Sequence, residues 1–201
     1  MYFCVLNHEF EVTGTPDIES FVKALPIYDK EFGFFDQYED EEMEYTLDKD
    51  NGFFHYYYLD VEDYIQYESA CWDRTDGKKL MIFTYNQYFC NTQDGAIQPA
   101  NPVVSPWYYA GHEVNTWEDE DGTFSKDVYS EGGFIAYLYN EDTHMLEPLS
   151  EPPFNGWNPK ATYRYLVLPQ DGSKDIEVAY GDEENSNHML KWNGMTFDYQ
   201  E

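Results

Sequence analysis

Residues 64–85 read YIQYESACWDRTDGKKLMIFTY, and this stretch decides the fold. Two runs rich in aromatic and β-branched residues flank Asp76-Gly77, a dipeptide that favours a tight hairpin turn. The stretch therefore predicts an antiparallel hairpin in which Cys71 lies opposite Met81 or Ile82.

The same pattern recurs toward the C-terminus. Runs that favour strands meet at three further turn signals, which are 140–143 (NEDT), 169–172 (PQDG) and 193–194 (NG). Residues 53–59 (FFHYYYL) are almost entirely aromatic, which suits a strand that packs on both faces. Short strands separated by such turns predict a mainly β fold of antiparallel hairpins, arranged as a meander, a sandwich or a barrel.

One short amphipathic helix is expected near the N-terminus. Thr15 suits the N-cap and Pro16 the first helical position, and Pro26 ends the helix. A single apolar stripe then follows the helical spacing at Ile18, Phe21, Val22 and Leu25.

The chain combines strong acidity with many aromatic residues. Its 201 residues include 40 Asp and Glu against 11 Lys and Arg, a formal net charge of −29, together with 20 Tyr, 14 Phe and 5 Trp. An acidic chain with few aromatics would be disordered, but this one has the apolar surface to build a core. We expect a single folded domain, 1–201, that carries its acids on the surface.

The charge excludes several classes of partner. No Lys or Arg occurs between Lys79 and Lys126, so direct binding of nucleic acid through its phosphates is not expected. Docking on an anionic membrane is disfavoured for the same reason. No apolar stretch approaches the roughly 18 residues of a membrane span, so membrane insertion is not expected either. The sequence leaves the oligomeric state open.

Two segments are predicted to be loops. An acidic loop spans about 36–50, because 36–44 (DQYEDEEME) concentrates like charges. A long irregular loop spans about 91–130, which is rich in Pro, Gly, Asn and Asp, and a second Pro- and Gly-rich connection at 148–159 carries a Trp that we expect to be exposed. The candidate binding residues lie in these segments: Trp107, Tyr108, Tyr109, Trp117, Trp157, Glu39, Asp40, Glu41 and Glu42.

The three cysteines, Cys4, Cys71 and Cys90, are predicted to be free thiols. In the hairpin, Cys90 would lie about eight residues beyond the position opposite Cys71. At about 3.4 Å per strand residue this separation exceeds roughly 25 Å. A disulfide requires Cα atoms within about 7 Å, so a bridge between these two residues is excluded unless the strand breaks near Tyr88 and turns back.

No catalytic motif is present, and an enzymatic function is not expected. His112-Glu113 begins like a zinc-protease helix, but Thr116 stands where the second His is needed. The five histidines are scattered and are interpreted as turn or surface residues. Calcium is the one cofactor left open, with Asp119 and Asp121 as weak candidate ligands, although the glycine spacing of an EF-hand loop is not met.

Two hairpin motifs carry a resemblance. The run 70–81 (ACWDRTDGKKLM) and the closing run 190–197 (LKWNGMTF) resemble hairpins of secreted or cell-envelope proteins of gut-commensal bacteria, a group of unknown function. The resemblance implies an exported, non-catalytic β protein in the periplasm, in the cell envelope or outside the cell, with its signal removed. The first residues, MYFCVLN, lack the basic start of a secretion signal, so a cytoplasmic location stays open.

These observations favour a non-enzymatic acidic binding or structural protein that recognises a basic protein or matrix partner. Two alternatives remain. The acids could mimic nucleic acid and inhibit a nucleic-acid-binding enzyme, because duplex DNA also presents a dense row of negative charges. The Trp and Tyr residues could instead form a glycan-binding module, because flat aromatic faces suit the C–H faces of sugars.

Overall fold

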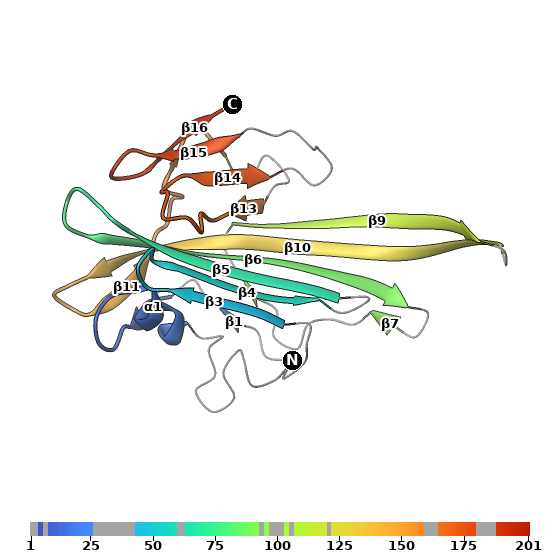
Figure 1. Ribbon diagram of the computed structural model, residues 1–201, viewed down its shortest axis with the longest axis horizontal. Coiled ribbons are helices and arrows are strands. Elements are labelled where there is room, and N and C mark those ends of the chain that lie inside the picture. The colour runs from blue at the N-terminus through green and yellow to red at the C-terminus, as the bar shows by residue number, and fades with distance from the viewer. Residues whose placement is uncertain are drawn as a thin grey trace.

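The protein is mainly β with one short helix near the N-terminus, as the sequence predicts (Figure 1). The computed structural model describes residues 4–5, 8–25, 43–59, 63–92, 95–96, 103–104, 107–119, 122–158, 165–179 and 188–201. Within these residues the strands form a nine-stranded sheet, a five-stranded sheet and a two-stranded parallel pair of β1 (Cys4–Val5) and β8 (Val103–Val104).

The nine-stranded sheet is antiparallel throughout and open. Two further strands lie beside its main path, with β7 (Gly95–Ala96) next to β6 and β9 (Trp107–Asp119) next to β10. From one end to the other the main path runs through β2 (Phe10–Glu11), β11 (Met145–Pro148), β10 (Gly122–Asn140), β6 (Lys79–Thr92), β5 (Asp63–Asp73), β4 (Phe53–Leu59) and β3 (Met43–Asp48).

The predicted central hairpin is β5–β6. Cys71 pairs with Met81 across it, which confirms the register expected from the turn at Asp76-Gly77. Strand β6 continues unbroken to Thr92, and Cys90 pairs with Val128 of β10, so the separation that excludes a disulfide is also confirmed. Cys71 is a free thiol, and burial raises its pKa well above the usual range.

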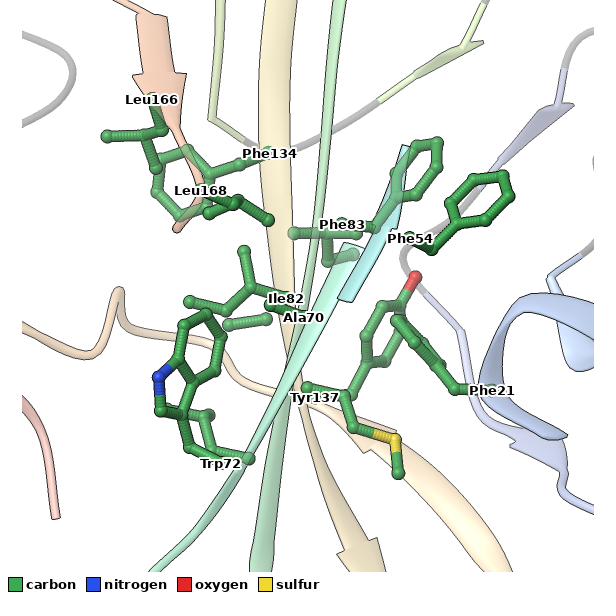
Figure 2. Close-up of a cluster of buried hydrophobic side chains, with 14 of the residues drawn as sticks. Phe21, Phe54, Ala70, Trp72, Ile82, Phe83, Phe134, Tyr137, Leu166 and Leu168 are labelled. Atoms are coloured by element: carbon green, nitrogen blue, oxygen red, sulfur yellow. The ribbon is translucent and has the colours of Figure 1, made fainter. Parts of the chain in front are cut away.

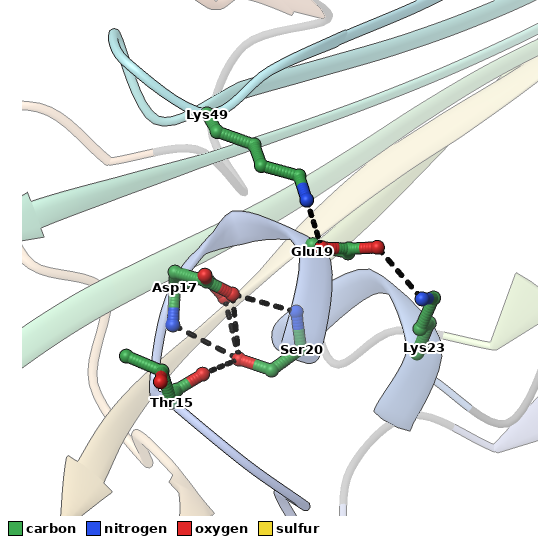
Figure 3. Close-up of polar contacts among 6 residues, drawn as sticks. All are labelled: Thr15, Asp17, Glu19, Ser20, Lys23 and Lys49. Carbon is green, nitrogen blue, oxygen red and sulfur yellow. Dashed lines mark hydrogen bonds and ion pairs between the residues drawn. The ribbon is translucent and has the colours of Figure 1, made fainter.

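The N-cap of the helix α1 (Ile18–Ala24) lies two residues later than expected. Asp17, rather than Thr15, is its N-cap, because the Asp17 side chain accepts a hydrogen bond from the Ser20 backbone N–H at 2.9 Å. The Ser20 hydroxyl accepts one from the Asp17 N–H in return at 2.9 Å, which completes a capping box (Figure 3). Lys23 and Lys49 both pair with Glu19 on the exposed side of the helix and lower its pKa to about 2.

The five-stranded sheet comes from the C-terminal part of the chain. Its β13–β14 and β15–β16 hairpins are those predicted from PQDG and from Asn193-Gly194. Only the β12–β16 pair is parallel. In order across the sheet, the strands are β12 (Phe154–Asn155), β16 (Phe197–Gln200), β15 (Met189–Trp192), β14 (Ile176–Ala179) and β13 (Tyr165–Val167).

The core lies on both faces of the nine-stranded sheet (Figure 2). On one face, Trp72 packs 5.3 Å from Phe197 of the five-stranded sheet, measured between ring centroids. On the other face, Tyr137 packs 5.7 Å from Phe21 of α1. The two sheets therefore form a sandwich, and the helix covers the outer side of the larger sheet.

Two predicted loops are partly wrong. Residues 107–119 and 122–130 lie in β9 and β10 rather than in an irregular loop, because the two strands pair continuously from Asp119↔Gly122 to Trp107↔Phe134. Residues 43–48 of the expected acidic loop form β3, since the aromatic strand β4 offers them a backbone partner. Residues 36–42 lie outside the described part of the chain.

The long β9–β10 hairpin extends beyond both covering layers (Figure 1). Strand β10 has 19 residues, which corresponds to roughly 65 Å of extended chain. Within the ranges that the structure describes, no helix has the length and apolar composition to cross a membrane.

Candidate functional site

Strand β9 contains four of the nine candidate binding residues and one of the two calcium candidates. Trp107 begins the strand, Tyr108 and Tyr109 follow it, and Trp117 and Asp119 lie at the other end. The sequence suggested only that these residues share a loop, whereas the structure places them along one extended backbone. Of the other candidates, Glu39, Asp40, Glu41, Glu42 and the calcium candidate Asp121 lie outside the described residues.

Trp157 does not belong to this site, and the expectation that it is exposed is wrong. Its relative exposure is 9%. The ring packs 5.3 Å from Phe154 and stacks on Tyr199 at 6.5 Å, measured between ring centroids. Trp157 therefore closes the edge of the core, because the β12–β16 pairing brings these aromatic rings together, and offers no open aromatic face.

Strand β9 is an edge of the nine-stranded sheet. Within the described part of the chain it pairs with β10 alone, so its other side carries no strand. At 13 residues it is far longer than the strands at the other sheet margins. These have two residues in β2, six in β3, two in β12 and three in β13.

A free antiparallel edge is a chemical surface in its own right. Every second residue directs its backbone N–H and C=O away from the paired neighbour, so β9 offers about six such residues over roughly 44 Å. These groups can hydrogen-bond to an added extended chain. Proteins usually protect such an edge by keeping the strand short, or by placing Pro or Lys along it.

The sequence of β9, WYYAGHEVNTWED, contains neither Pro nor Lys. Its charged residues are the acids Glu113, Glu118 and Asp119, and Glu120 and Asp121 follow directly in the sequence. Acidic side chains repel other acidic strands and attract basic ones. By its sequence charge, this edge disfavours pairing with another acidic strand.

Five cations elsewhere in the described structure form intramolecular ion pairs. Lys23 and Lys49 pair with Glu19 beside the helix, as Figure 3 shows. Three more pairs lie near the β5–β6 turn or on the five-stranded sheet: Arg74–Asp76 at 2.8 Å, Lys79–Asp73 at 2.5 Å and Lys191–Asp175 at 2.8 Å. The sequence of β9 itself holds no Lys or Arg, and the register places Lys126 of β10 opposite Asn115.

A second polar cluster, which sequence reasoning missed, centres on Glu68 of β5. This side chain is almost completely buried, with a relative exposure of 1%. Glu68 Oε1 lies 3.2 Å from His55 Nδ1 and accepts a hydrogen bond from Gln66 Nε2 at 3.0 Å. Glu68 Oε2 accepts a hydrogen bond from the Leu168 backbone N–H at 3.0 Å.

This cluster joins the two sheets. His55 and Gln66 belong to the nine-stranded sheet, while Leu168 follows β13 of the five-stranded sheet. His55 is thus a largely buried strand residue, contrary to its interpretation as a turn or surface residue. The signal was available in the sequence, since Glu68 falls in the alternating series Gln66, Glu68, Ala70, Trp72, whose last two members are core residues.

No metal centre emerges from the residues that can be described. Among them, no three His, Cys, Asp or Glu side chains gather closely enough to hold an ion, and calcium binding stays a prediction. No protein-family model, curated protein or solved structure matches this chain. The resemblance to envelope proteins of gut commensals likewise stays a prediction.

Proposed function

We propose that the protein is a non-enzymatic binding protein for a basic protein or matrix partner, and that β9 is the contact strand. The observation that carries the proposal is the separation of charge along the fold. Cations form pairs at the helix, at the β5–β6 turn and on the five-stranded sheet, whereas β9 contains three acids and no Lys or Arg.

This separation has a physical consequence for association. A net charge of −29 creates a field that attracts basic molecules from beyond the contact distance. That field is screened over about 10 Å at 0.1 M salt, so steering depends strongly on ionic strength. Final binding then requires short-range contacts, which the outer backbone edge of β9 supplies.

Neither alternative function gains support from the described residues. The glycan-binding hypothesis loses Trp157, whose ring is packed in the core. The nucleic-acid-mimic hypothesis and an exported location stay predictions.

The proposal is tested with a peptide of about twelve residues that alternates Lys and Thr, whose extended length of about 41 Å matches that of β9. Isothermal titration calorimetry should show binding at about 50 mM salt and little at about 500 mM. A peptide that alternates Glu and Thr should not bind at either salt concentration.

Two matched protein variants locate the interaction. Glu113→Gln with Glu118→Gln removes two charges from β9, and we expect this variant to weaken binding of the Lys–Thr peptide about two- to five-fold per charge. Glu141→Gln with Asp142→Asn removes two exposed charges from the β10–β11 turn and serves as the control, with binding close to wild type. Equal weakening by both variants would show that only net charge matters and would refute β9 as the contact strand.

A further inference from the structure

We infer that the partner of this protein binds as an extended basic segment that adds to the outer edge of β9 as a further strand of the nine-stranded sheet. This inference rests on the proposed function and specifies how the basic partner is held. Three features of β9 carry it: the length of the edge, the absence of Pro and Lys along it, and the sign of its charge.

Length comes first. The edge of β9 runs for 13 residues, while β3, the next longest strand at a margin of a described sheet, has six. An added strand gains main-chain hydrogen bonds in proportion to the length that it pairs, so β9 offers about twice the bonding of β3. Because β9 is held along all 13 residues by β10, it is ordered before the partner arrives.

Charge selects the occupant. A second copy of this chain would bring another net charge of −29 and would place β9 acids beside β9 acids. Like charges placed directly opposite each other in a sheet are destabilising. A strand that carries Lys or Arg would instead find the opposite charge at Glu113, at Glu118 and at Asp119. Charge thus selects a basic segment over self-association.

The Lys–Thr peptide allows strand addition to be separated from simple charge attraction. An extended peptide has two edges, which carry the N–H groups of alternate residues. Methylation of the Thr amides alone leaves the Lys edge able to pair. Methylation of every amide removes both edges and leaves the charge unchanged.

We expect the peptide methylated only at Thr to bind within about three-fold of the unmodified peptide, and the fully methylated peptide to bind about ten-fold more weakly or worse. If the fully methylated peptide bound as tightly as the unmodified one, strand addition would be refuted, while recognition of basic partners would stand. If no Lys–Thr peptide bound, the proposed function itself would fail.

Amide hydrogen exchange, followed residue by residue by NMR, then locates the added strand. In the free protein, alternate amides of 107–119 should exchange fast, because only every second one bonds to β10. The unmodified peptide should slow these fast amides and leave those of 43–48 unchanged. Protection at 43–48 instead would place the peptide on β3. Slow exchange of all amides of 107–119 in the free protein would show that the outer edge of β9 is already covered. Either outcome would overturn the inference.

Discussion

Replacing Glu68 with alanine should weaken the contact between the two sheets and lower the stability of the protein. The change removes the carboxyl oxygens that lie close to His55 and accept hydrogen bonds from Gln66 and the Leu168 N–H. Leu168 is buried, with a relative exposure of 1%, so its N–H would be left without a partner. Such an orphaned donor costs about 1–3 kcal/mol. The contacts with Gln66 and His55 contribute about 0.5–1.5 kcal/mol each.

We therefore expect Glu68→Ala to lower the free energy of unfolding by about 4 kcal/mol. At about 2–4 °C of melting temperature per kcal/mol for a chain of this size, the midpoint should fall by roughly 8–16 °C. Urea unfolding followed by tryptophan fluorescence measures the loss. Glu68→Gln should cost less, about 1–2 kcal/mol, because its remaining oxygen can still accept from the Leu168 N–H.

The matched control is Glu177→Ala, an exposed acid on β14, which should change stability by no more than about 0.5 kcal/mol. A loss below about 1 kcal/mol for Glu68→Ala would show that the cluster does not hold the sheets together. The same holds if the alanine and glutamine variants lose equal stability, because the argument depends on the lost acceptor for Leu168.

Three further changes test other parts of the structure. Among the described residues, the buried Ser69 hydroxyl has no hydrogen-bond partner, so Ser69→Ala should stabilise the protein by about 1 kcal/mol in urea unfolding. Gly194 has φ +96° and an added Cβ would approach Thr75 Cγ2 to 2.9 Å, so Gly194→Ala should destabilise by about 1–3 kcal/mol, measured the same way. Hydrogen bonds from Asn155 and Asn193 lower the pKa of Asp198. Its stabilising contribution is therefore present above the unfolded pKa of about 4 and is lost as the pH falls through the lowered folded value. Melting curves between about pH 5 and 2 should show a smaller decrease for Asp198→Asn than for wild type.

Hairpins could be predicted from the sequence because their signals are local. Asp76-Gly77 and Asn193-Gly194 specify the turn, and a turn of fixed length specifies which residues face each other across it. The register Cys71↔Met81 follows directly from this. The helix was found by the same kind of local signal, and its N-cap was misassigned by two residues because Thr15 and Asp17 both suit that position.

Strands β3 and β9 were missed because their own composition disfavours strands, although each forms a hairpin with the strand that follows it. Gly, Asn and like charges disfavour an isolated strand, so 43–48 and 107–119 look irregular by themselves. In the fold, β3 pairs with the aromatic strand β4, and β9 pairs along its full length with β10, which is itself paired with β6. Pairing of β10 with β6 joins residues far apart in sequence, which no local pattern encodes.

The candidate site was only half predictable for a related reason. Aromatic and acidic residues near 107–119 were identified by composition, but composition does not say that they lie on a sheet edge. Trp157 was misjudged because Pro and Gly around it suggest exposure, whereas the ring is held by Phe154 and Tyr199 from other segments. Glu68 shows the reverse error. It is one of 40 acidic residues, so composition did not distinguish it, although its side chain is buried.

The acidity of the chain and the long edge of β9 are physically related. A 13-residue edge without Pro or Lys would ordinarily promote aggregation, because identical chains could pair through it. The net charge of −29 opposes that pairing at long range, so the edge can stay open without self-association. The same charge strains the folded state by self-repulsion, which salt relieves. Salt should therefore stabilise the fold and weaken binding of a basic strand. Opposite effects of salt on stability and on binding would indicate that the negative charge serves recognition rather than folding.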